Sequence, residues 1–299
     1  MPSYSEVLII YNPTSTGGHA EQKATKLAER LRKRDLHVVL QSTKHPGHAE
    51  ALAYQACLDY QKPLIISASG DGGYNEVVNG IMRATIDQPG IKPVCAVLPS
   101  GNANDHRRSV RKRPLAWAIL NTEPEQLDLL QLSVHKDRVT TIRYAHSYIG
   151  VGITTHIATY LNATSLNRWR SNLLVARSIF TYHPVAITNN EGRTKRYDSL
   201  IFAIVPHMAR ILRTGDKTDI NNGSFRVAAL PHRSQFWPVR ITLNILLYVF
   251  GLQKLPQQAV YNFSVPQDEL IHLDGEVIKL PGQAEATVSV SRAVLTVIR

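Results

Sequence analysis

Short apolar runs alternate with helix-like segments in the amino-terminal part of the chain, and this alternation constrains the fold most strongly. The apolar run Val7–Tyr11 is followed by Glu21–Arg34, whose apolar residues recur at the spacing of an amphipathic helix. Strands that alternate with helices predict a parallel sheet with helices on both faces. The other expected strands are Leu36–Gln41, Pro63–Ala68 and Val94–Leu98, and the other expected helices are His48–Tyr60 and Tyr74–Met82.

After Leu127 the pattern changes to short segments of alternating apolar and polar residues, which is typical of antiparallel strands. A chain of 299 residues is long enough for two domains. We expect an α/β domain at 1–126 and a β-rich antiparallel domain at 127–287, with residues 288–299 able to return to the first. Two segments of the second part look helical, 171–178 and 239–250. The expected strands are Leu127–Val134, Val139–Tyr144, Leu200–Val205, Phe225–Ala229, Val260–Val265, Leu270–Leu273 and Thr287–Ile298.

Net charge is the bulk property that points to a partner. The 34 Lys and Arg residues exceed the 23 Asp and Glu residues and give a charge of +11, with several local clusters, among them Arg30–Arg34. Nucleic acid, an anionic membrane surface and simple solubility each fit such a charge. Because no aromatic residues are interleaved with the basic clusters, nucleic acid is not expected as a partner. The 2 cysteines and an amino terminus that reads as a first strand favour a cytoplasmic location.

Glycine-bearing loops follow three of the expected strands. They are Asn12–Gly18, Gly70–Gly73 and Ser100–Asp105. The carboxyl ends of parallel strands meet at one edge of a sheet, so these loops are expected to open together. Glycine lets backbone N–H groups approach phosphate oxygens, and the start of the next helix adds partial positive charge. For Gly70–Gly73 alone, a tight strand-to-helix turn with Asp71 as the helix cap is an equally good interpretation.

These loops resemble those of the diacylglycerol kinase catalytic domain. The resemblance rests on GDGGYNEVVNG (Gly70–Gly80), on the Asn-Pro loop before it and on LPSGNAND after it, and extends to NNGSFRV (Asn221–Val227) and HLDGEVI (His272–Ile278). The family includes bacterial diacylglycerol kinases, YegS-like lipid kinases, sphingosine kinases and ceramide kinases. The resemblance implies a NAD-kinase-like nucleotide domain and a β-rich domain that accepts a lipid.

The activity implied by this resemblance is phosphorylation of the hydroxyl of a diacylglycerol-like lipid with ATP and Mg²⁺. Such an enzyme serves lipid metabolism and phospholipid biosynthesis, and it is cytoplasmic and peripherally membrane-associated. Its partner is a lipid substrate at a membrane surface, with a homodimer left open. The sequence alone leaves the acceptor undecided.

The family's motifs also imply roles for individual residues. Asp71 and Asp105 would organise Mg²⁺ and the triphosphate, since carboxylates suit this cation. Glu276 would accept the proton of the lipid hydroxyl, although its position alone indicates a solvated hairpin residue. A structural Mg²⁺ would fall on Asp219, Asn222 and Ser224. The implied nucleotide-binding residues are Asn12, Pro13, Thr14, Ser15, Thr16, Thr43, Ser69, Gly70, Asp71, Gly72, Gly73, Tyr74, Asn75, Gly101, Asn102 and Asn104.

Several positions depart from the family's pattern. Gly73 and Asn102 each stand where the family usually has Thr, and Asn221 and Asn222 replace an acidic pair. Amide oxygens bind hard cations less strongly than carboxylates, which weakens the case for the structural metal. Three alternatives stay open: a sphingoid-base kinase, an NAD kinase, and a nucleotide- or lipid-binding member of the family with weakened catalysis.

Overall fold

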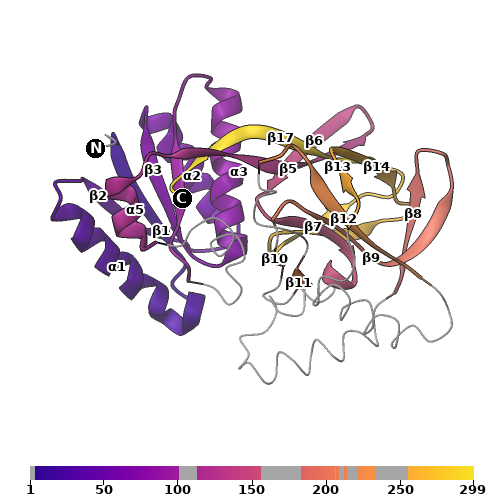
Figure 1. Ribbon diagram of the computed structural model, residues 1–299, viewed down its shortest axis with the longest axis horizontal. Coiled ribbons are helices and arrows are strands. Elements are labelled where there is room, and N and C mark those ends of the chain that lie inside the picture. The colour runs from indigo at the N-terminus through magenta and orange to yellow at the C-terminus, as the bar shows by residue number, and fades with distance from the viewer. Residues whose placement is uncertain are drawn as a thin grey trace. The chain divides into compact units, whose positions relative to one another are not determined.

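The computed structural model of the protein describes residues 4–100, 113–155, 183–205, 207–208, 212–213, 221–232 and 255–299. The chain divides into two compact units, whose elements are labelled in Figure 1. Unit 1 is Met1–Leu129 with Arg292–Arg299, and unit 2 is Leu130–Ser291. The expected helices at 171–178 and 239–250 lie outside the described residues.

Unit 1 is built on a parallel sheet. Its strands follow the order β4-β3-β1-β2, and the end of β17 pairs with the free side of β4, where Val297 lies opposite Cys95. Strands β1, β3 and β4 are buried along nearly their whole length, as expected when helices cover both faces of a sheet. The predicted parallel sheet is therefore confirmed. The strands are β1 (Glu6–Tyr11), β2 (Val38–Ser42), β3 (Pro63–Ala68), β4 (Val94–Val97) and β17 (Glu285–Val297).

One face of this sheet is covered by α1 and α5. Leu27 and Leu31 of α1 and Ile119 of α5 share one buried cluster with Ile9 of β1 and Ile66 of β3. The sequence pattern did not predict α5, whose apolar stretch is short. Its residues are Leu115–Asn121, those of α1 are His19–Arg32, and a short 3-10 helix, η1 (Ser15–Gly18), precedes α1.

The other face is covered by α3 (Asp71–Asp87), beside which lies α2 (His48–Asp59). The Tyr74 hydroxyl lies 3.2 Å from Sγ of Cys95, a strand residue that faces away from the first cluster. Helix α3 begins earlier than the predicted Tyr74, because two glycines in its first turn, poor helix formers, obscure the pattern. Gly70 holds the N-cap position, so Asp71 is the first helical residue and not the expected cap.

Unit 2 is an antiparallel assembly of strands, as predicted. Strand β9 pairs with β7, β8 and β12, and β15 pairs with β7 on one side and with β16 on the other. The strands are β5 (Glu125–Lys136), β6 (Val139–Ala145), β7 (Tyr148–Gly152), β8 (Val185–Asn189), β9 (Thr194–Ala203), β10 (His207–Met208), β11 (Leu212–Arg213), β12 (Phe225–Pro231), β13 (Gln257–Gln258), β14 (Val260–Ser264), β15 (Glu269–Leu273) and β16 (Glu276–Leu280).

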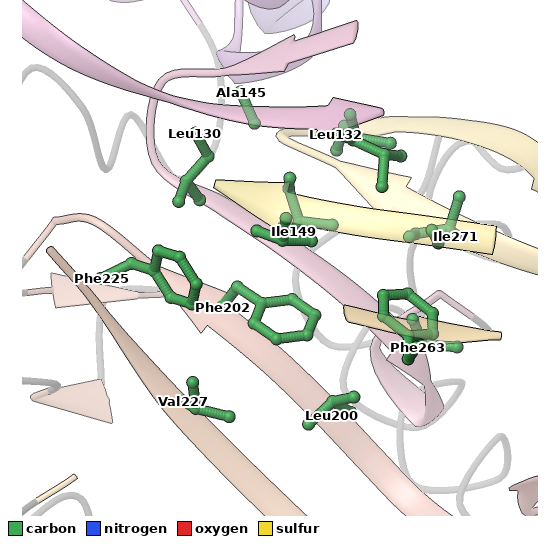
Figure 2. Packing of buried hydrophobic residues seen from close by; sticks show 14 of the residues in the cluster. Leu130, Leu132, Ala145, Ile149, Leu200, Phe202, Phe225, Val227, Phe263 and Ile271 are labelled. Carbon is green, nitrogen blue, oxygen red and sulfur yellow. The ribbon is translucent and has the colours of Figure 1, made fainter. Parts of the chain in front are cut away.

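Aromatic side chains occupy the centre of the unit 2 core (Figure 2). The ring of Phe202 lies 5.7 Å from that of Phe225 and 6.0 Å from that of Phe263. Ile149 of β7 and Ile271 of β15 belong to the same cluster. Burial of each such side chain contributes about 1.5–3 kcal/mol to folding. This core therefore stabilises the strands that lead to Glu276.

Candidate functional site

The predicted nucleotide loops follow the carboxyl ends of the unit 1 strands and therefore lie at one edge of the parallel sheet. Backbone hydrogen bonds join each loop to a neighbour, so their positions depend on one another. These bonds run from the N–H of Asn12 to the carbonyl of Ala68 (3.4 Å), from the N–H of Thr43 to that of Tyr11 (2.9 Å) and from the N–H of Ser100 to that of Ser69 (3.0 Å).

Asn12 shapes the loop after β1. Its side-chain oxygen accepts hydrogen bonds from the backbone N–H of Thr14 at 3.0 Å and from the Thr14 hydroxyl at 2.8 Å. The N–H of Ser15 bonds to the Asn12 carbonyl at 3.0 Å. Such a turn is typical of asparagine and fixes the loop without help from other elements. Pro13 and Thr14 are exposed at its tip.

The loop after β3 leads directly into α3. Gly70, Asp71, Gly72 and Gly73 are all half-buried, and the last three form the first helical turn. N–H groups in a first turn have no partner within the helix and carry partial positive charge. Because Gly72 and Gly73 in this turn lack side chains, an anion can approach the backbone closely.

Gly73 has a second reason to be glycine. A Cβ at this position would lie 2.5 Å from Oγ and 2.8 Å from Cβ of Ser69. The Ser69 side chain is held there, since its hydroxyl lies 2.6 Å from the Ser67 hydroxyl and donates to the Gly70 carbonyl at 3.1 Å. A threonine at position 73, which the family usually has, would therefore clash with Ser69.

Other predicted nucleotide residues lie deeper or outside the described structure. The side chains of Tyr74 and Asn75 are buried within unit 1. The side chain of Thr16 is outside the described part of the structure. The predicted residues Gly101, Asn102, Asn104, Asp105 and Asp219 also lie outside it.

In unit 2, a clamped hairpin presents Glu276. Asp274 and Gly275 form the turn between β15 and β16 with φ values of 49° and 104°, and Glu276 is the first residue of β16. The Asp274 carboxylate is fully buried and accepts hydrogen bonds from consecutive backbone N–H groups at the start of β7. The donors are His146 (2.5 Å), Ser147 (3.0 Å) and Tyr148 (2.8 Å).

His272 supports the same turn. Its Nε2 accepts a hydrogen bond from the N–H of Gly275 at 2.8 Å, and its ring centre lies 5.3 Å from that of Tyr148. Nδ1 is then the protonated nitrogen, and it has no hydrogen-bond partner within the described residues. Burial lowers the pKa of His272 to about 4, which keeps the ring neutral as this bond requires.

The carboxylate of Glu276 lies beside a cation that the sequence did not reveal. Arg143, near the end of β6, places Nη2 3.5 Å from Oε2 of Glu276, with exposures of 26% and 19% for the two side chains. Glu276 is thus a half-buried, charge-paired carboxylate and not the freely solvated hairpin residue that its position alone suggests. Nothing in the local sequence around Arg143 signals this contact.

The predicted structural metal site is described only in part. The side-chain oxygen of Asn222 accepts hydrogen bonds from the N–H of Ser224 at 3.0 Å and from its hydroxyl at 2.8 Å. Asn222 therefore closes its own turn. Within the described ranges, no group of three or more His, Cys, Asp or Glu side chains is placed to hold a metal ion.

The sequence of unit 1 matches a known protein family. Residues 6–135 match the family named diacylglycerol kinase catalytic domain. This segment of the chain is similar to that catalytic domain. The matched segment contains the Asn12 turn, the opening of α3 and nearly all of β5, the strand that pairs with the Arg143 strand β6, whereas Glu276 lies beyond it.

Individual proteins extend the likeness. A diacylglycerol kinase of Bacillus subtilis is 34% identical over 102 residues, and one of Staphylococcus epidermidis is 36% identical over 102 residues. These matches span only about a third of each relative, 32% and 30% of its length. YtlR of Bacillus subtilis, which is named as a lipid kinase, is 27% identical over 218 residues, covering 67% of this chain and 68% of YtlR.

Solved structures share the fold of both units. A crystal structure of a diacylglycerol kinase from Bacillus anthracis has a TM-score of 0.67 with 16% identity, covering 100% of this chain and 98% of the other. A second structure from that organism reaches 0.71 at 16% identity with the same coverage. At this identity the likeness establishes the fold. None of the helices within the described ranges combines the length and apolar character needed to cross a membrane.

Proposed function

We propose that the protein is a kinase that uses ATP and Mg²⁺ to phosphorylate the hydroxyl of a diacylglycerol-like lipid at a membrane surface. The observation that carries this proposal is the opening of α3 at the carboxyl end of β3, where Gly70–Gly73 offers bare backbone. The family match of residues 6–135 and the lipid kinase name of YtlR support the same reaction class.

The residues of unit 1 fit a magnesium nucleotide. The first turn of α3 favours negative charge, and Gly72 carries no side chain that would keep an anion from its backbone. Asp71 lies in that turn, half-buried, and its carboxylate is the kind of ligand that Mg²⁺ prefers. Asp105 is the second carboxylate that the family's pattern assigns to the cation.

Bound nucleotide and Mg²⁺ would supply the phosphoryl group and the positive charge that stabilises its transfer. The residues of the chain then have two tasks, orientation and proton removal. Glu276 accepts the proton of the lipid hydroxyl, which makes the hydroxyl oxygen a better nucleophile. Arg143 holds the Glu276 carboxylate in one orientation.

The buried Asp274 carboxylate and the three backbone N–H groups that bind it, called the Asp274 clamp, make this orientation reproducible. Its three backbone donors fix the β15–β16 turn to the start of β7, so Glu276 has little freedom to move with the hairpin. Effective acid–base catalysis depends on such positioning, because a proton acceptor acts only within hydrogen-bond reach of its donor.

The acceptor can be identified directly. The full chain is incubated with labelled ATP, Mg²⁺ and mixed-lipid vesicles that contain a diacylglycerol and a sphingoid base, with NAD in solution. We expect label in the phosphorylated diacylglycerol. Label in the sphingoid base would keep the reaction class and replace the acceptor. Label in NAD would overturn the lipid assignment, and nucleotide binding without any transfer would indicate a member with weakened catalysis.

A further inference from the structure

Basic residues follow one side of α1. Lys23, Lys26, Arg30 and Lys33 are spaced by 3, 4 and 3 positions, and all four are exposed. At 3.6 residues per turn, this spacing keeps them within about 80° of arc around the helix. Leu27 and Leu31 lie on the buried side of α1, whereas these four residues, called the α1 basic stripe, are exposed to solvent.

The charges of the α1 basic stripe are largely uncompensated. The side chains of Lys26, Arg30 and Lys33 form no ion pair or hydrogen bond within the described part of the chain. Glu29 is the acidic residue at the margin of the stripe, and it forms no ion pair with described residues either. Like charges spaced along a helix repel one another, so a stripe of this kind costs some stability when it has no partner.

The stripe begins at the edge of the sheet that holds the nucleotide loops. Nζ of Lys23 donates a hydrogen bond at 3.0 Å to the carbonyl of Pro99, in the loop after β4. From that point the other members follow α1 away from the loops, over a distance of about 15 Å at 1.5 Å per residue. A flat anionic surface that contacts the stripe would therefore also lie close to this edge.

We propose that the α1 basic stripe binds the anionic surface of a lipid bilayer. The inference rests on the proposed function, because a lipid kinase must meet its acceptor at a membrane. Each Lys or Arg near an anionic bilayer contributes about 1 kcal/mol, which is roughly a fivefold gain in affinity. The three members without a protein partner would together raise the affinity about 100-fold.

Nucleic acid is the competing ligand for such a stripe, and the observations favour the bilayer. The stripe contains no aromatic side chain on which a base could stack. The lipid acceptor of the proposed reaction is part of a planar surface, and a straight row of charges on one side of a helix can contact such a surface along its whole length. Competition with a short DNA duplex forms one arm of the test.

The test compares two triple variants of the full chain. The first replaces Lys26, Arg30 and Lys33 by Glu. The matched control replaces Lys92, Arg138 and Lys195 by Glu, because these residues are exposed bases outside the stripe and change the net charge equally. Binding is measured by cosedimentation with vesicles of phosphatidylcholine alone and of phosphatidylcholine with phosphatidylglycerol, at low and high salt.

Because the substitutions reverse three charges, we expect the stripe variant to lose binding to the phosphatidylglycerol vesicles by at least about 100-fold, and the control to lose much less. Wild-type binding should weaken as salt rises, since exposed charges are screened. A Glu29→Lys variant should bind these vesicles more tightly. Equal losses in both triple variants, or wild-type binding in the stripe variant, would overturn the proposal. So would tighter binding of the DNA duplex than of the vesicles.

A second readout separates this proposal from the proposed function. The stripe variant should phosphorylate a short-chain diacylglycerol, dispersed as monomers, at the wild-type rate while losing activity on vesicles. If neither protein phosphorylates any lipid but wild-type vesicle binding still depends on the stripe, the proposed function fails and the docking surface stands. If activity on vesicles is unchanged in the stripe variant, docking through α1 is wrong and the kinase assignment is unaffected.

Discussion

A Cβ at position 73 would lie 2.5 Å from the hydroxyl oxygen of Ser69, so the two positions are sterically coupled. Gly73→Ala should therefore reduce the free energy of unfolding by about 1–3 kcal/mol, the usual cost of overpacking. The loss should be smaller in a Ser69→Gly background, where the clashing atoms are gone. Urea denaturation of the four proteins in this cycle measures the coupling.

Gly80 provides the control for this cycle. Its missing Cβ would meet the backbone carbonyl of Glu50 at 2.3 Å, which no side-chain change can relieve. Gly80→Ala and Ser69→Gly should then have additive effects on unfolding. Additive effects of Gly73→Ala and Ser69→Gly as well would show that Ser69 does not determine the residue at position 73.

Arg143 should support turnover through Glu276. Arg143→Gln is expected to lower kcat for lipid phosphorylation roughly tenfold, because a charge-assisted contact to the carboxylate is lost. Arg143→Lys should retain more activity, since it keeps the cation without the planar fork. Arg138→Gln, on an exposed residue of the same β5–β6 hairpin, is the control and should leave kcat unchanged. Equal rates for wild type and Arg143→Gln would rule out this role.

The Asp274 clamp should be important for the stability of unit 2. Asp274→Asn places an N–H donor group where a buried carboxylate accepts three backbone N–H groups, and should cost about 2–3 kcal/mol. Asp268 also accepts a backbone N–H, from Gly282 at 2.8 Å, but its side chain is 54% exposed. Asp268→Asn should therefore destabilise the protein much less than Asp274→Asn does. Similar costs for both variants in urea denaturation would contradict the clamp.

His272 should make the protein less stable in acid. Burial lowers its pKa from 6.5 to about 4, so below pH 6.5 the unfolded chain takes up a proton that the folded chain does not. The stability contributed by neutral His272 is complete above pH 6.5 and is lost as pH falls to about 4, by roughly 3 kcal/mol. His272→Gln can still accept from Gly275 and cannot titrate. Its stability curve should fall less steeply than that of wild type between these pH values, and parallel curves would refute the assignment.

The unit 1 fold could be predicted from the sequence because its signals are local. Strand β3 has the predicted bounds Pro63–Ala68, and α2 ends one residue before the predicted Tyr60. The first turn of α3 escaped prediction because glycine is a poor helix former, although it is the turn that opens the site. Burial of Tyr74 and Asn75 likewise became visible only when the helix was packed.

The surroundings of Glu276 could not be predicted, because they depend on contacts between distant parts of the chain. The Asp-Gly pair indicates a hairpin turn, but the donors that bind Asp274 lie 126 to 128 positions away in the sequence. Arg143 is as remote from Glu276, and its strand pattern is that of an ordinary exposed edge. Only the folded antiparallel unit brings these groups together.

In the proposed function, the opening of α3 binds the nucleotide and Glu276 accepts the proton of the lipid hydroxyl. The most direct test measures ATP affinity and lipid phosphorylation in Glu276→Gln, with Asp71→Ala alongside. We predict that Glu276→Gln binds ATP as wild type does and phosphorylates lipid at least about 100-fold more slowly, while Asp71→Ala yields no labelled phospholipid. Wild-type phosphorylation by Glu276→Gln would contradict the account.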